Sequence, residues 1–127
     1  MSKEVADKFV EALWKLEEDR DVEALVEIHT DDCDVGNVAV PKTFSGHEGL
    51  REFWTSYRDT FGEMKSEFRS VFSDEAGHAA LEWNTSAEAN GKDVSYDGVS
   101  MLEIEDGKVS RFRAYFDPRT VNDQVVS

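Results

Sequence analysis

The chain has 127 residues, enough for one domain spanning residues 1–127, and its 28 acidic and 14 basic side chains give a formal net charge of −14. A surface of this charge repels nucleic-acid phosphates and anionic lipid headgroups, which argues against nucleic acid and membrane as partners. No apolar run approaches the roughly 20 residues of a membrane span, and the charged start MSKEVADKF is unlike a secretory signal peptide.

Apolar residues at helical spacing dominate the first half of the chain. A first helix is expected from the stripe of Val5, Phe9, Leu13 and Leu16. A shorter helix is expected from Val22 to His29, with His29 on its apolar stripe. The segment SGHE, residues 45–48, has the pattern of a capping box in which Ser45 and Glu48 open a third helix. The apolar stripe of that helix consists of Leu50, Trp54, Tyr57 and Phe61.

From Met64 onward the apolar period changes to two residues, which predicts strands. The pairs Asn90-Gly91 and Asp106-Gly107 are hairpin signals between these strands. A short strand over residues 33–40 is expected before the third helix. Helices followed by a meander of antiparallel strands predict an α+β fold, in which a curved sheet wraps around the helices.

The register of the last hairpin decides which side chains face the interior. A two-residue loop at Asp106-Gly107 would place Leu102 opposite Arg111, whereas a three-residue loop that includes Glu105 pairs Ser100 with Phe112. We prefer the second register because it gathers the apolar side chains on one face. It turns inward Tyr96, Gly98, Ser100, Leu102, Ile104, Phe112, Ala114 and Phe116, and it turns outward Val99, Met101, Arg111, Arg113 and Tyr115.

Three of the inward side chains, those of Gly98, Ser100 and Ala114, are small. Small neighbours among aromatic residues either admit another element closely or leave a hollow. Close packing and a ligand pocket are therefore both open interpretations of this face.

Four segments together resemble the SnoaL-like branch of the nuclear-transport-factor-two-like superfamily: FVEAL, DVEALVEIHTDDCDV, FSGHEGLREFW and MLEIEDGKVSRFRAYFDP. The resemblance covers nearly the whole chain and implies a cone-shaped barrel of mixed, mainly antiparallel sheet closed by the N-terminal helices. The superfamily includes isomerases, polyketide cyclases, epoxide hydrolases, ligand binders and noncatalytic association modules. The fold therefore does not settle the function.

The resemblance implies that the usual acidic catalysts are replaced. Phe9, Asn37 and Ser100 occupy the positions of the three catalytic groups of ketosteroid isomerases, and Ala114 that of an aspartate of limonene-type epoxide hydrolases. Asn37 cannot accept a proton at neutral pH. SnoaL-type cyclases use an aspartate near the end of the fold, for which Asp117 is the nearest candidate. The alternative role for Asp117 is a strand-end cap or a salt bridge.

The histidines and the cysteine complete the search for reactive groups. A buried His29 could hold a proton, or it could be a core histidine bound to backbone. The histidines have no metal-ligand spacing and nothing indicates a cofactor, so neither a metal nor a cofactor is expected. The single cysteine, Cys33, cannot form an internal disulfide and is read as a buried filler. A reducing cytoplasm is therefore the expected location.

The leading hypothesis is a pocket for a small hydrophobic or aromatic ligand, with isomerase, cyclase or hydrolase chemistry if a reaction occurs. His29 and Asp117 are the candidate proton carriers. The candidate ligand-binding residues are Trp14, Asn37, Trp54, Tyr57, Trp83, Tyr96, Ser100 and Ala114. The alternative is a noncatalytic ligand-binding or association module that forms a homodimer through the outward face of the last strands.

Overall fold

The computed structural model describes residues 2–126 and contains four helices and six strands within them. The helices are α1 (Ser2–Asp19), α2 (Glu23–Glu27), α3 (Gly46–Asp59) and α4 (Pro118–Val126). The strands are β1 (His29–Asn37), β2 (Phe44–Ser45), β3 (Met64–Ser73), β4 (His78–Ala89), β5 (Lys92–Glu105) and β6 (Lys108–Phe116). Within residues 2–126, no helix is both long and apolar enough to cross a membrane.

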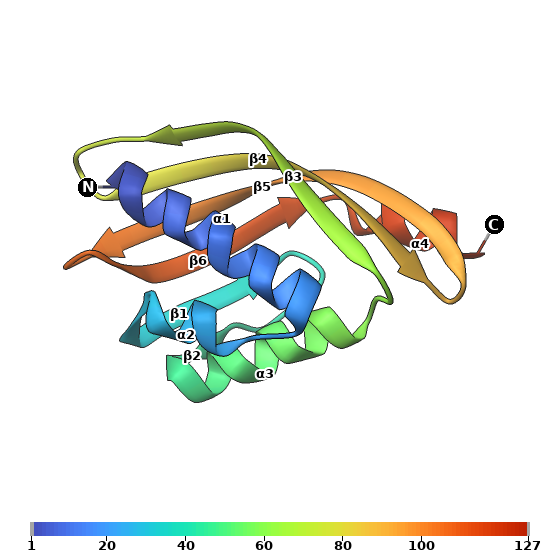
Figure 1. Cartoon of the computed structure of the whole chain (residues 1–127), viewed down its shortest axis with the longest axis horizontal. Coiled ribbons are helices and arrows are strands. Elements are labelled where there is room, and N and C mark those ends of the chain that lie inside the picture. Colours follow the sequence, from blue (N-terminus) through green and yellow to red (C-terminus); the bar gives the residue numbers. More distant parts are fainter. Residues whose placement is uncertain (1, 127) are drawn as a thin grey trace.

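The six strands form one mixed sheet in the order β2-β1-β6-β5-β4-β3. Only β1 and β6 run parallel; the other neighbouring pairs are antiparallel. Figure 1 shows α1 lying across one face of the long strands, with α2 and α3 beside β1 and β2. The predicted α+β fold, a curved sheet with helices packed on it, is confirmed. The sheet is not closed into a barrel, because β2 and β3 remain its two edges.

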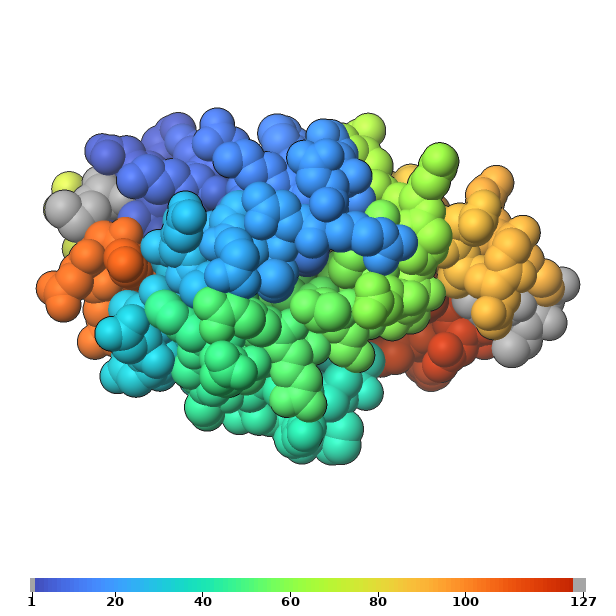
Figure 2. Space-filling model, turned by 60° about the horizontal axis from the view of Figure 1, so that its bottom comes forward, coloured from blue at the N-terminus to red at the C-terminus, as the bar shows by residue number. Residues whose placement is uncertain are grey.

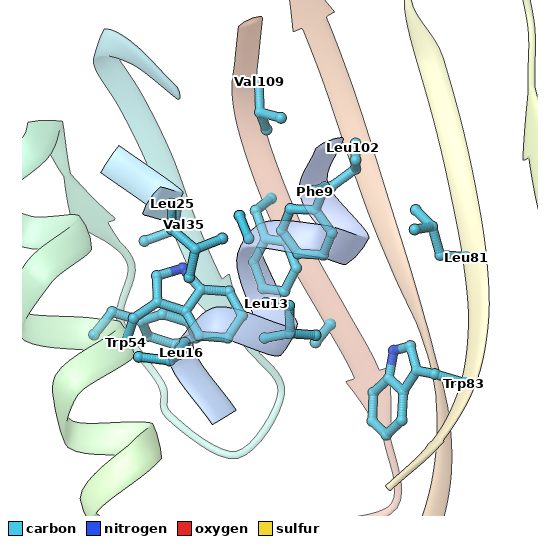
Figure 3. Packing of buried hydrophobic residues seen from close by; sticks show 14 of the residues in the cluster. Phe9, Leu13, Leu16, Leu25, Val35, Trp54, Leu81, Trp83, Leu102 and Val109 are labelled. Carbon is cyan, nitrogen blue, oxygen red and sulfur yellow. The ribbon is translucent and has the colours of Figure 1, made fainter. Parts of the chain in front are cut away.

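The core lies between α1, α3 and the inner face of the sheet (Figure 3). The predicted stripe of α1 is buried in full. Trp54 of α3 packs against Phe112 of β6 with ring centroids 4.9 Å apart, and it meets the Phe9 ring of α1 at 6.3 Å. Since each buried aromatic side chain contributes about 1.5–3 kcal/mol, this cluster holds the helices against the sheet.

The predicted register of the last hairpin is wrong by two residues, although the predicted faces are correct. Asp106 and Gly107 both have positive φ, 52° and 77°, and form a two-residue turn rather than the expected three-residue loop. A bulge at Ser110 then restores the pattern, so Ser100 pairs with Ala114 instead of Phe112. Because side chains alternate with a period of two, a two-residue shift keeps every side chain on its predicted face.

Two further local predictions are also wrong. His29 does not lie on the second helix: α2 ends at Glu27, and His29 opens β1 opposite Val109 of β6. The capping box at SGHE does not form, because Ser45 makes no side-chain capping bond and Glu48 pairs with Arg51. Ser45 belongs to β2 instead, and Gly46 at φ 71° makes the turn into α3.

Candidate functional site

The main cavity, of about 360 Å³, opens at one end of the core between α3, the loop after β1 and the start of α4. Figure 2 shows these segments side by side, with α3 in green, the loop in teal and the start of α4 in red. Six of the lining residues are aromatic and, among residues 2–126, the lining contains no charged side chain. The cavity is lined by Asn37, Ala39, Val40, Phe44, Phe53, Ser56, Tyr57, Thr60, Phe61, Tyr96, Phe116, Pro118, Val121 and Asn122.

A second, inner chamber of about 30 Å³ lies deeper in the core. It shares five wall residues with the main cavity, namely Asn37, Phe53, Tyr57, Tyr96 and Phe116. Its remaining walls include most of the other predicted ligand-binding residues, which are Trp54, Trp83, Ser100 and Ala114. A chamber of this size holds about one water molecule. Of these two spaces, only the main cavity has room for a larger ligand.

The hollow expected beside the three small residues is mostly filled by one side chain. A Cβ atom added to Gly98 would lie 2.5 Å from the Trp83 ring, so Gly98 is small because the indole packs directly on it. The indole Nε1 donates a hydrogen bond to Ser100 Oγ over 2.9 Å. Of the two interpretations, close packing applies at Gly98, while Ser100 and Ala114 line only the inner chamber.

Two tyrosines meet where the main cavity joins the inner chamber. The hydroxyl oxygens of Tyr57, on α3, and Tyr96, on β5, are 3.2 Å apart. Burial raises the pKa of Tyr96 to about 12 and the pKa of Tyr57 well above its ordinary value. Both phenols are therefore neutral at pH 7, and they can exchange hydrogen bonds with a ligand without acting as bases.

Asn37 adds a third polar group at this junction, at the end of β1. Its Oδ1 accepts a hydrogen bond from the Ala39 backbone N–H over 2.9 Å, which fixes the orientation of the amide. This orientation leaves the two Nδ2 protons of Asn37 available to a ligand acceptor.

Three of the predicted site residues line neither cavity: Trp14, His29 and Asp117. Trp14 donates from Nε1 to the Ser66 carbonyl over 2.8 Å, and Lys65 lies over its ring. Asp117 pairs with Arg119 over 2.9 Å and also accepts the Arg119 backbone N–H, at the start of α4. These contacts match the strand-end cap and salt bridge that the sequence left open for Asp117.

His29 is fully buried in the core. Its Nδ1 lies 2.7 Å from the Leu25 carbonyl oxygen, and among residues 2–126 its Nε2 has no hydrogen-bond partner. Burial lowers the pKa of His29 to about 4, so the ring is neutral at pH 7. Its position gives no contact with either cavity to support a role in proton transfer.

Two buried polar residues next to the site, Glu17 and Arg58, were not predicted from the sequence. Glu17 follows Leu13 by four residues and so continues the buried stripe of α1, a spacing that could have placed it in the core. Arg58 directly follows the stripe residue Tyr57, and no comparable pattern in the sequence marks it as buried.

Most of the chain matches a known protein family. The SnoaL-like domain matches residues 7–112. The chain belongs to the SnoaL-like family. Among curated proteins, no sequence matches it.

Solved structures show the same fold over nearly all of this SnoaL-like domain. TerC, co-crystallised with polyporic acid, aligns with a TM-score of 0.83 at 19% identity, over 99% of this chain and 98% of TerC. A protein with a ketosteroid isomerase-like fold from Catenulispora acidiphila, in complex with trimethylamine, has a TM-score of 0.82 at 12% identity, over 95% and 91% of the two chains. An LEH-like epoxide hydrolase from M. tuberculosis has a TM-score of 0.71 at 18% identity, over 98% and 92%. At these identities the likeness is one of fold.

Proposed function

We propose that this SnoaL-like domain binds a small, hydrophobic aromatic molecule in the main cavity. The observation that carries the proposal is the pair of neutral tyrosine hydroxyls, 3.2 Å apart, at the inner end of an uncharged, aromatic cavity of about 360 Å³. Apolar walls with a few convergent polar groups are typical of sites for such ligands. The TerC structure, which holds polyporic acid in the same fold, is consistent with this ligand class.

The polar groups also limit the chemistry that we propose. Asn37, Tyr57 and Tyr96 can hold a carbonyl or hydroxyl oxygen of the ligand, and hydrogen-bond donors aimed at such an oxygen stabilise negative charge that develops there. Among residues 2–126, no carboxylate or imidazole lines the cavity to accept a proton. Any isomerase or cyclase activity would therefore use polarisation of the ligand, with proton transfer within the ligand or through water.

Removing either tyrosine hydroxyl is expected to weaken ligand binding. For polyporic acid or a related aromatic ketone, Tyr57→Phe and Tyr96→Phe should each raise Kd by about 3- to 10-fold, because each loses a hydrogen bond of about 1 kcal/mol. Calorimetric titration measures this directly. Tyr115→Phe is the matched control, since Tyr115 is exposed on the other face of the sheet. Equal affinities in all three variants, or no binding across a panel of aromatic compounds, would contradict the proposal.

A second candidate function is association with another copy of the chain through the outer face of the sheet. Tyr115 of β6 is 47% exposed there and lies opposite Val99 of β5. Two residues along the same face, Arg113 of β6 lies opposite Met101 of β5. A mixed apolar and arginine-containing surface of this kind is common in protein interfaces.

The dimer proposal predicts a concentration-dependent mass of two chains in light scattering. Tyr115→Glu should shift this mass to that of one chain, because a carboxylate would be buried without a partner at the interface. Val71→Glu is the control, because Val71 is exposed on the edge strand β3 and lies away from the β5 and β6 surface proposed as the interface. A single-chain mass for the wild type at high concentration would exclude this function.

A further inference from the structure

Glu17 is a buried carboxyl in the middle of the core, with only 2% of its surface exposed. It projects from the last turns of α1 toward β3. The Ser66 backbone N–H donates to Glu17 Oε1 over 2.9 Å, and Ser66 Oγ lies 2.5 Å from Glu17 Oε2. Both carboxyl oxygens are thus held by one residue of β3.

Hydroxyl groups continue from Ser66 to the cavity. Ser66 Oγ lies 2.7 Å from Thr85 Oγ1 on β4. Thr85 and Tyr57 both line the inner chamber, where the Thr85 hydroxyl acts to lower the pKa of Tyr57. Tyr57 in turn contacts Tyr96, which lines both the inner chamber and the main cavity. The chain of contacts therefore runs from a titratable group in the core to the inner end of the proposed ligand site. It comprises two helix residues and three strand residues.

We propose that Glu17 is a positioning residue that sets, through Ser66, Thr85 and Tyr57, whether Tyr96 presents a hydrogen-bond donor or an acceptor to the cavity. The inference rests on the proposed ligand site for its functional meaning, but the hydroxyl chain itself exists without a ligand.

The direction of the chain follows from counting protons. Each hydroxyl has one proton to donate, so neighbouring hydroxyls must all point the same way. When Glu17 is ionised it can only accept, so the hydroxyls point inward and Tyr96 offers its oxygen lone pair to the cavity. When Glu17 is protonated it can donate to Ser66, so the chain can reverse and Tyr96 can donate to the cavity. The change consumes one proton from solvent and otherwise requires only rotation of hydroxyls.

The charges around Glu17 allow both states. Burial raises the pKa of Glu17 and is the dominant influence, while the two Ser66 bonds and the positive charges of Lys65 and Arg58 act in the opposite direction. Lys65 comes from β3 and Arg58 from α3, and the tyrosines of α3 and β5 are the other titratable groups coupled to the carboxyl. The titration of Glu17 is thus displaced from the range of an exposed glutamate toward neutral pH.

Tyrosine NMR tests the chain directly, because the protein has three tyrosines and the third, Tyr115, lies outside the chain on the other face of the sheet. With 13C label at tyrosine Cζ, we expect the Tyr57 and Tyr96 signals to move together as Glu17 titrates, with one shared midpoint above the pKa of an exposed glutamate. The Tyr115 signal should not follow this midpoint. In Glu17→Gln both movements should disappear, because the amide fixes one direction and does not titrate.

Two variants separate this role from a structural one. Glu18→Gln changes the neighbouring, exposed carboxyl of α1 and should leave the Tyr57 and Tyr96 titration intact. Thr85→Val removes the middle hydroxyl at nearly constant volume, and it should abolish the tyrosine response although Glu17 remains. Flat tyrosine signals in the wild type, or a response that persists in Thr85→Val, would overturn the proposal.

Ligand preference gives the functional readout. Benzophenone, which can only accept a hydrogen bond, should bind about 3- to 10-fold more tightly relative to 4-phenylphenol at low pH than at high pH. In Glu17→Gln this ratio should be independent of pH. If neither compound binds while the tyrosine titration is present, the ligand site fails and the hydroxyl chain stands. If both bind with a constant ratio and the tyrosine signals are flat, the chain fails and the ligand site stands.

Discussion

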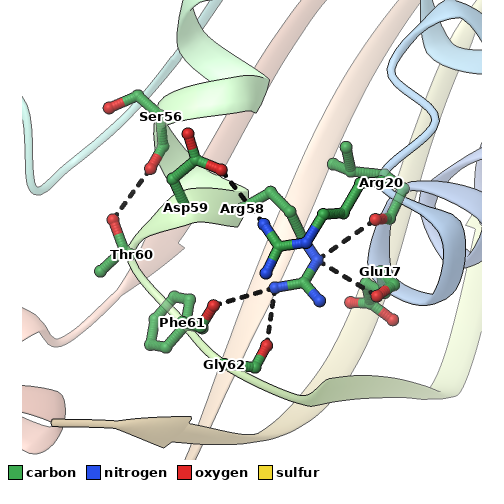
Figure 4. Close-up of polar contacts among 9 residues, drawn as sticks. Glu17, Arg20, Ser56, Arg58, Asp59, Thr60, Phe61 and Gly62 are labelled. Carbon is green, nitrogen blue, oxygen red and sulfur yellow. Dashed lines mark hydrogen bonds and ion pairs between the residues drawn. The ribbon is translucent and has the colours of Figure 1, made fainter.

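Arg58→Met is expected to lower the free energy of unfolding by about 3–5 kcal/mol. Arg58 is buried and donates from Nε to the Leu16 and Glu17 carbonyls, over 3.2 and 3.1 Å. From an η nitrogen it donates to the Phe61 and Gly62 carbonyls, over 3.0 and 2.7 Å (Figure 4). Methionine fills a similar volume but leaves the Glu17, Phe61 and Gly62 carbonyls without this donor, while the Leu16 carbonyl keeps the Arg20 backbone N–H over 3.0 Å.

Arg20→Met is the matched control for Arg58, because it removes a nearby guanidinium whose ion pair with Asp59 is exposed. Exposed pairs contribute about 0–1 kcal/mol. Urea denaturation followed by tryptophan fluorescence measures both variants. A loss at Arg58 no larger than the loss at Arg20 would show that the Glu17, Phe61 and Gly62 carbonyls find water or other donors.

The second large expected effect is an acid-dependent loss of stability caused by His29. Its pKa is about 4 in the folded state and 6.5 when unperturbed, because burial disfavours the charged ring. Between these values the unfolded chain binds a proton that the folded chain does not, so stability falls as the pH is lowered from 6.5 to 4. The full difference corresponds to about 3 kcal/mol, present above pH 6.5 and lost below the folded pKa.

His29→Leu isolates this contribution from the many carboxylates. The Leu25 carbonyl keeps a donor in the variant, since the Ile28 N–H also contacts it over 3.2 Å. Between pH 7 and pH 4, the free energy of unfolding should therefore fall by about 3 kcal/mol less in the variant than in the wild type. His78→Gln replaces an exposed histidine, and it should change the loss of unfolding free energy between pH 7 and pH 4 by less than 1 kcal/mol. Parallel pH profiles for wild type and His29→Leu would refute the assignment.

The fold was largely predictable because the two apolar periods are strong along this chain. The stripe of α1 and the alternation of β4 and β5 predicted both the elements and the faces that they bury. The register of the last hairpin was not predictable in the same way. The bulge at Ser110 depends on how β6 twists against β5 and β1, and no local residue preference predicts it.

The candidate site was predictable in its aromatic residues and not in its geometry. Tyr57 and Tyr96 were expected in a pocket because both lie on inward faces, but their contact joins a helix to a strand 39 residues away. The Trp83 ring fills the deep core by packing on Gly98 of the neighbouring strand, a contact that the pattern within one strand does not predict. Glu17 lies on the buried stripe of α1, but it was not predicted in the core because a charged residue is usually exposed.

The bulge at Ser110 has a consequence for how this ribbon can change in length. Ser110 is the one extra residue of β6 opposite β5, so its deletion would leave a regular ladder in which Arg111 to Phe116 keep their partners and their sides. Adding one residue to the regular part of the strand would instead exchange its two sides, moving arginines into the cavity wall and phenylalanines into solvent. This ribbon can therefore lose one codon at residue 110 without turning its arginines inward.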